Sequence, residues 1–97
     1  MPAPPSPIRT LEPVFTVHWL PPHKVIVHNN DWNTFDEVIA ILVLAVPQLS
    51  LAEAIGLTQE VHRTGAAVVF RGDVAQADLC AGIIRTIGIR VSVEPDT

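Results

Sequence analysis

Four polar side chains in two parts of the sequence have the types needed to hold a small charged group. Asn29, Asn30 and Asp31 directly follow the β-rich run Val25–His28, and His62 lies much further along the chain. Amide and carboxylate oxygens accept hydrogen bonds, and so does one nitrogen of a neutral imidazole. Polar side chains at a strand end often form small binding sites. The alternative is an ordinary strand–turn–helix link, in which Asn and Asp bond only their own backbone.

Catalytic and metal chemistry find little support in the same sequence. A zinc site needs converging ligands, and His23 and His28 are five positions apart on a predicted strand, so they face opposite sides. Cys80 lies within a predicted helix and not at a helix N-terminus, where a thiolate would be stabilised. Ser50 is placed as a helix cap, and no nucleophile-elbow, phosphate-loop or dinucleotide motif occurs. We therefore expect neither an enzyme nor a metal or cofactor site.

Composition and charge narrow the class of protein further. Apolar residues make up 48% of the 97 residues, which indicates one globular domain with a modest core. The net charge is −4 and the six basic residues are scattered, so a nucleic-acid partner is not expected. The longest apolar run, Val38–Val46, is too short to span a bilayer, so no membrane partner is expected. The single cysteine excludes an internal disulfide and fits a cytoplasmic location.

The first twenty residues differ in composition from the rest of the chain. Prolines are concentrated before position 14, and proline resists both helix and sheet, so we predict a flexible arm over residues 1–20. The more apolar part of this arm, Val14–Leu20, either stays partly ordered or covers an apolar surface. Pro21 and Pro22 then mark the start of a domain over residues 21–97.

Periodicity and capping signals predict six elements in this domain. Their order is strand, helix, helix, strand, helix, strand, over residues 23–29, 34–46, 51–63, 66–70, 73–87 and 89–94. Capping boxes mark the helix starts at Thr34–Glu37 (or Asn33–Asp36), Ser50–Glu53 and Asp73–Gln76. Three strands are too few for a doubly wound sheet. We therefore predict a small α/β (α+β) domain, in which helices pack on one face of a three-stranded, mostly antiparallel sheet.

The same patterns predict which faces are buried. The helix over 34–46 is apolar on most sides, so we expect it to be largely buried. One face of the next helix should carry Leu51, Ile55, Thr58 and His62, with Leu57 and Val61 flanking it. In the strand over 66–70, Val68 and Phe70 should point to the same side. Gly56 and Gly82 lie inside helices at a cost, which close packing would explain.

The order and spacing of these motifs resemble the ClpS family, adaptors that deliver proteins with destabilising N-termini to Clp-family AAA+ unfoldases. The segment Pro21–Asp31 is similar to the family's opening strand and loop, and Gln59–Gly65 to its helix-end histidine. The segments Gln76–Cys80 and Val91–Pro95 look closest to plant and cyanobacterial members. The resemblance runs from about Leu20 to Pro95 and implies the family's α/β fold.

The resemblance implies that the protein binds a free α-amino group attached to a large apolar side chain. Asn29, Asn30 and His62 match the positions that bind the amine, and Asp31 is a possible support. The family usually has an aspartate where Asn30 stands. Loss of that charge should weaken binding, so Asn30→Asp should tighten it.

The resemblance also implies an apolar pocket for the side chain. Its wall positions are matched by Phe35, Val38, Ile41, Thr58 and Val61. Phe35 and Thr58 stand where many members have methionines, so the entrance should be narrower and the interior wider.

Residues near the start of the third helix match family positions that contact the ATPase N-domain. These are Asp73, Gln76 and Asp78, and Asp78 replaces a lysine common in bacterial members. Like charges across an interface are costly, so we expect a ClpC-type partner to be preferred over a ClpA-type partner. The alternative functions are an interaction domain that docks on an AAA+ partner without reading N-termini, and, last, a small hydrolase or ligand-binding enzyme.

Overall fold

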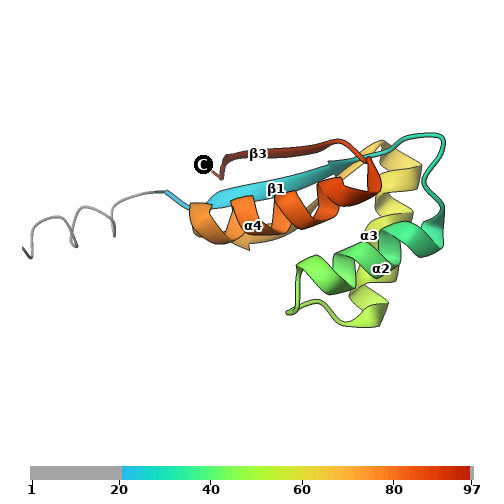
Figure 1. The fold of residues 1–97 in the computed structure, drawn as a ribbon, viewed down its shortest axis with the longest axis horizontal. Coiled ribbons are helices and arrows are strands. Elements are labelled where there is room, and N and C mark those ends of the chain that lie inside the picture. Colours follow the sequence, from blue (N-terminus) through green and yellow to red (C-terminus); the bar gives the residue numbers. More distant parts are fainter. Residues whose placement is uncertain (1–20, 97) are drawn as a thin grey trace, which may run out of the picture.

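A computed structural model describes residues 21–96, so the predicted N-terminal arm lies outside the described residues. The elements follow the predicted order (Figure 1). They are β1 (His23–His28), α2 (Phe35–Ala45), α3 (Leu51–Thr64), β2 (Ala66–Gly72), α4 (Val74–Ile84), the 3₁₀ turn η1 (Arg85–Ile87) and β3 (Val91–Pro95).

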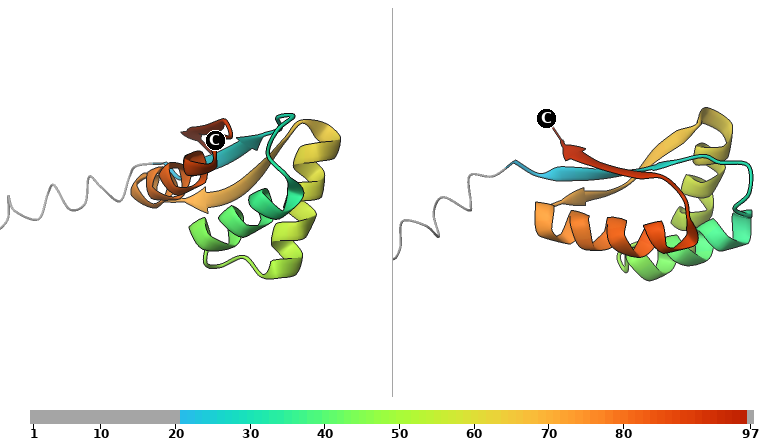
Figure 2. Two further views of the ribbon diagram at one scale, coloured as in Figure 1. Left: turned by 45° about the vertical axis from the view of Figure 1, so that its right-hand side comes forward. Right: turned by 45° about the horizontal axis from the view of Figure 1, so that its top comes forward.

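The three strands form one antiparallel sheet in the order β2-β1-β3. The helices lie on one face of this sheet, below it in the right-hand view of Figure 2, which confirms the predicted fold class. Val25 and Val27 of the central strand are fully buried against the helices. Lys24, Ile26 and His28 alternate with them and are only half-buried, as the period of two requires.

Two helices begin with the predicted capping boxes. The backbone N–H of Thr34 donates to Glu37 Oε1 at 2.8 Å, and the Glu37 N–H donates back to Thr34 Oγ1 at 3.1 Å. Ser50 and Glu53 make the same pair of bonds at the start of α3. The hydrogen bond from the capping backbone lowers the pKa of each glutamate from its ordinary value. Thr34, and not Asn33, is therefore the N-cap of α2.

The third helix begins at the predicted cap, Asp73, but without the second bond of a capping box. Asp73 caps α4 by accepting from the backbone N–H of Ala75 at 3.0 Å. Within the described residues the Gln76 side chain makes no reciprocal bond, so the predicted capping box is wrong at this helix. A single capping bond satisfies only one of the free N–H groups at the helix start.

A β-bulge changes the expected face of β2. Val25 pairs with Phe70, but the next residue, Ile26, pairs with Val68, which leaves Val69 as an extra residue. Directly opposed residues in an antiparallel pair point to the same side, so Phe70 faces the helices and Val68 faces away. The prediction that these two side chains share a side is therefore wrong.

The helices also bury different faces from those predicted. In α3 the buried residues are Ala54, Thr58 and Val61, whereas Leu51 is 62% exposed. Thr58 of the expected face is therefore buried as predicted, whereas the centre of the buried face is shifted toward Ala54 and Val61. In α2, Leu44 is 67% exposed, so this helix is less buried than its apolar sequence suggests.

The glycines within and at the end of the helices have different surroundings and backbone conformations. Apart from the neighbouring residues and the backbone of its own helix, no heavy atom of the described residues lies within 4 Å of the position that a Cβ would take at Gly56, so close packing does not explain this glycine. Gly82 in α4 is equally open. Gly65 differs, because it ends α3 in the left-handed region with φ of 98°.

We predict that substitution by alanine has opposite effects on stability at Gly56 and at Gly65. Gly56→Ala should raise the free energy of unfolding by about 1 kcal/mol, because alanine is the better helix former. Gly65→Ala should lower it by about 1 kcal/mol or more, because a Cβ is strained at positive φ. Urea unfolding of both variants checks this, and equal effects would contradict the assignment of Gly65 as the helix terminator.

Candidate functional site

The end of β1 is tied to the end of α3. The backbone N–H of His28 donates to the Arg90 carbonyl at 3.0 Å, and that of Asn29 donates to the Gly65 carbonyl at 2.9 Å. Gly65 lies directly after the last turn of α3, which carries His62. The fold thus places Asn29 and His62 beside each other although they are distant in the sequence.

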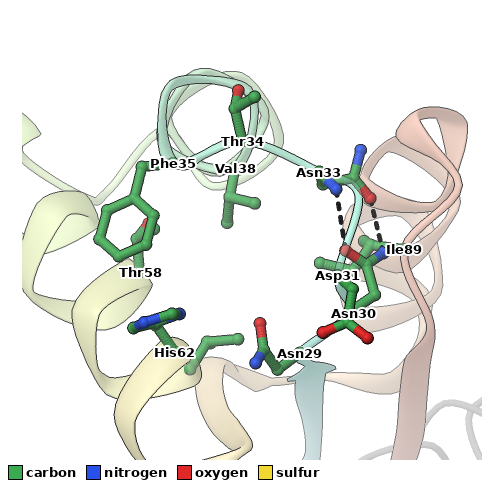
Figure 3. Close-up of a pocket in the computed structure, with 11 residues that line it drawn as sticks. Asn29, Asn30, Asp31, Asn33, Thr34, Phe35, Val38, Thr58, His62 and Ile89 are labelled. Atoms are coloured by element: carbon green, nitrogen blue, oxygen red, sulfur yellow. Dashed lines mark hydrogen bonds between the residues drawn. The ribbon is translucent and has the colours of Figure 1, made fainter.

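A cavity of about 260 Å³ opens at this junction (Figure 3). Its wall includes nearly all of the residues expected for the amine and the pocket, namely Asn29, Asn30, Asp31, Phe35, Val38, Thr58, Val61 and His62. The exception is Ile41, which does not line the cavity and is only 7% exposed within the core. Ile41 lies about one helical turn beyond Val38 toward the C-terminal end of α2.

Most of the apolar part of the cavity comes from α2 and α3. Val38 and Val61 are both buried, and Figure 3 shows Val38 directed into the cavity from α2. The ring of Phe35 meets the imidazole of His62 edge to face, with centroids 5.1 Å apart. Phe35 is 43% exposed, so it forms part of the rim. The resulting surface suits an apolar side chain that enters past an aromatic edge.

Thr58 uses its hydroxyl within its own helix. Its Oγ1 donates to the Ala54 carbonyl at 2.8 Å, and the side chain is buried. The hydroxyl proton is therefore not available to a bound molecule. Thr58 adds little polar character to the cavity in spite of its type.

Asn30 is held by its own loop. Its Oδ1 accepts from the backbone N–H of Asn33 at 3.0 Å and from that of Trp32 at 3.3 Å. Its Nδ2 donates to Asn33 Oδ1 at 2.7 Å. A carbonyl oxygen has two lone pairs, and both are engaged here. The expected acceptor for an amine is therefore already occupied at this position.

Sequence reasoning missed three residues that line the cavity, Asn33, Thr34 and Ile89. Asn33 was considered only as an alternative helix cap, and Thr34 only as the cap itself. Ile89 was expected to lie in the last strand, but it precedes β3 and is buried. No local pattern links Ile89 to the loop, because the two meet only after folding.

Neither a metal-ligand cluster nor an exposed cysteine occurs in residues 21–96. No three His, Cys, Asp or Glu side chains gather as metal ligands in residues 21–96. Cys80 is buried, its Sγ donates to the Ala45 carbonyl at 3.1 Å, and burial raises the pKa of the thiol. Between residues 21 and 96 no helix has the length and apolar character needed to cross a membrane.

The expected ATPase-contact residues lie away from the cavity. Asp73, Gln76 and Asp78 are all exposed at the start of α4. His23 of β1 pairs with Gly72, the residue before Asp73, whereas the cavity loop follows the opposite end of β1. The two surfaces are therefore at opposite ends of the central strand (Figure 1).

Comparison with known proteins identifies relatives of this chain. Residues 20–87 match the family model described as ATP-dependent Clp protease adaptor protein ClpS. The ClpS adapter protein of Synechococcus elongatus is 30% identical over 78% of this chain and 80% of its own length. That of Thermosynechococcus vestitus is 38% identical over 78% and 82%. The chloroplastic CLPS1 of Arabidopsis thaliana is 36% identical over 78% of this chain and 48% of its own length.

A solved structure shares the fold. ClpS2 of Agrobacterium tumefaciens, bound to L-phenylalaninamide, superposes with a TM-score of 0.72 at 22% identity and covers 78% of this chain and 98% of that one. Members of the matched family are adaptors of the Clp protease and not enzymes. From the family match and the extent of these similarities, the chain belongs to the ClpS family of Clp protease adaptor proteins.

Proposed function

We propose that this protein binds the N-terminal residue of substrate proteins and delivers them to a Clp-family AAA+ ATPase. The observation that carries the proposal is the position of Asn29 and His62 at the edge of an apolar cavity of about 260 Å³. Hydrogen-bond acceptors beside an apolar space suit a free amine attached to a large apolar side chain. The phenylalaninamide bound to the Agrobacterium relative, a free amine with an aromatic side chain, supports the same ligand class.

The amine is the polar half of the proposed ligand. An ammonium group has three donors and no acceptor, so its site must supply acceptors. The Asn29 amide oxygen and a neutral nitrogen of His62 are the first two, and the carboxylate of Asp31 adds negative charge at the same cavity. Asn30, expected as the third amine ligand, supports the loop in this proposal because its oxygen is engaged.

The side chain of the N-terminal residue is the apolar half. It would lie against Phe35, Val38, Thr58 and Val61, which all line the cavity. Burial of an aromatic or leucine side chain contributes roughly 1.5–3 kcal/mol, whereas a small polar residue gains little. We therefore assign a preference for bulky apolar N-terminal residues.

The ATPase would contact the start of α4. Asp73, Gln76 and Asp78 form this surface, and the negative charge of Asp78 favours a ClpC-type N-domain over a ClpA-type one. A substrate in the cavity leaves this surface uncovered, because the two lie at opposite ends of β1. A cytoplasmic location remains part of the proposal.

Titration with short peptides tests the proposed ligand. Peptides that begin with Phe, Leu or Trp and have a free amine should bind, and a peptide that begins with Gly should bind far more weakly. Acetylation should reduce affinity at least ~10-fold, since hydrogen bonds to a charged group contribute about 1.5–3 kcal/mol. Fluorescence anisotropy measures both differences. Equal binding of free and acetylated peptides, or none by either, would favour a domain that docks on the ATPase without reading N-termini.

His62 should be required for that binding. We expect His62→Ala to weaken binding of the free-amine peptide by about 1–3 kcal/mol, because an ammonium donor loses its partner. His23→Ala is the matched control, since His23 lies at the other end of β1. Unchanged affinity in His62→Ala rules out the assigned role.

The partner surface makes a separate prediction. We expect tighter binding to a ClpC-type than to a ClpA-type N-domain, and Asp78→Lys should shift the ratio of the two affinities at least ~10-fold toward ClpA. Asp36→Lys makes the same charge change on α2 and should leave the ratio unaltered. Calorimetry with both isolated N-domains measures the ratio. Tight ClpA-type binding by the unaltered protein would show that this assignment is wrong.

A further inference from the structure

Two asparagine side chains connect the cavity loop to a distant turn. Asn33 Nδ2 donates to the Ile87 carbonyl of η1 at 2.9 Å. Asn33 Oδ1 accepts from Asn30 Nδ2 at 2.7 Å, and Asn30 Oδ1 accepts from the Asn33 backbone N–H at 3.0 Å. Figure 3 shows the two bonds between Asn30 and Asn33 on the side of the cavity opposite Phe35 and His62. The chain of bonds therefore begins and ends on backbone groups.

These backbone groups allow only one orientation of the two amides. A carbonyl can only accept, so the Asn33 NH₂ group must face Ile87 and its oxygen must face Asn30. A backbone N–H can only donate, so the Asn30 oxygen must face Asn33 N. The Asn30 NH₂ group is then the only group left to meet the Asn33 oxygen. Flipping either amide would place like groups against each other.

Asn33 also holds the loop against two elements at once. Its Nδ2 lies 3.4 Å from Glu37 Oε1 in the first turn of α2, besides its bond to Ile87. Glu37 in turn accepts from the Thr34 N–H in the capping box. The Asn33 amide is thus placed between α2 and η1, two elements that lie on either side of the loop.

We propose that Asn33 is a positioning residue, which fixes the loop that carries Asn29 and Asp31 and requires a hydrogen-bond donor at position 30. The proposal rests on the proposed function, since its purpose is to hold the amine site in place. It also revises the expectation that Asn30→Asp tightens binding. A carboxylate at position 30 has no proton to donate, so it would meet the Asn33 oxygen with another acceptor.

Rotation of the Asn33 amide does not remove this unfavourable contact between two acceptors. Rotation of the Asn33 amide would turn its NH₂ toward position 30, but its oxygen would then face the Ile87 carbonyl. A serine at position 33 behaves differently, because its hydroxyl rotates freely and can donate to a carboxylate. Asn33→Ser loses the hydrogen bond to Ile87, but it also removes an amide whose donor and acceptor have fixed positions. The effect of Asn30→Asp should therefore depend on which residue occupies position 33.

A double-mutant cycle tests this dependence. The four proteins are the unaltered chain, Asn30→Asp, Asn33→Ser and the double variant, titrated with a peptide that has a free N-terminal Phe. Asn30→Asp alone should weaken binding about 5-fold, whereas Asn30→Asp in the Asn33→Ser background should tighten it. The two effects of Asn30→Asp on affinity should therefore differ at least ~10-fold, which is within the range seen for residues in contact. Equal effects of Asn30→Asp in both backgrounds would overturn the proposal.

Thermal unfolding of the same four proteins separates this proposal from the proposed function. Asn30→Asp should lower Tm by about 4 °C alone and by clearly less when combined with Asn33→Ser. If none of the four proteins binds the peptide, the proposed function fails. The Tm values then still decide whether position 30 must carry a hydrogen-bond donor. Equal Tm losses in both backgrounds would overturn it. Thr86→Ala is the matched control, because it removes another side-chain bond in the same region, from Thr86 Oγ1 to the Ile83 carbonyl at 2.6 Å.

Discussion

The bond between the Asn29 N–H and the Gly65 carbonyl is the constraint on which the candidate site depends. It joins the end of the central strand to the residue that ends α3, at 2.9 Å. Gly65 turns its backbone into the left-handed region while its own N–H bonds the Val61 carbonyl, which ends the helix and starts the next strand. His62 lies in the last turn of that helix. A backbone bond, and not a side-chain contact, therefore sets the relative position of Asn29 and His62.

Polar and apolar groups divide the cavity between them. Buried valines form its interior, and the aromatic edge of Phe35 packs against the imidazole of His62 and restricts the ring. Asp31 is the only charged residue in the cavity wall of the described structure. A positive amine would therefore meet one full negative charge together with the neutral acceptors of Asn29 and His62, and all three residues are solvent-exposed. That arrangement limits the cost of burying opposite charges.

The sheet also separates the cavity from the proposed ATPase-contact surface. The loop after His28 borders the cavity, whereas His23 at the other end of β1 pairs with the residue before the start of α4. The fully buried Val25 and Val27 lie between these ends, so the strand is a rigid spacer. In the proposed function, a substrate N-terminus and a partner domain would then bind without steric conflict. This geometry is consistent with the adaptor family to which the chain belongs.

Local chemistry made much of the fold predictable. Capping boxes depend on residues three positions apart, and a left-handed terminator depends on one glycine, so Thr34, Ser50 and Gly65 were assigned from the sequence and confirmed. The pairing of Asn29 with His62 came from a family resemblance, because no local rule connects residues so far apart. Only the three-dimensional structure shows that both residues line the same cavity.

Only the tertiary structure decided the features that depend on distant partners. The bulge at Val69 reverses the side of Val68 relative to Phe70, because register is set by the neighbouring strand. Asn30 has the right type for an amine ligand, yet its oxygen is engaged by its own loop. Its orientation also follows, through Asn33, from a carbonyl in another turn of the fold. The sequence by itself determined which groups are available, and three-dimensional packing determined which remain free, since each donor or acceptor is used by whichever partner folding brings near it.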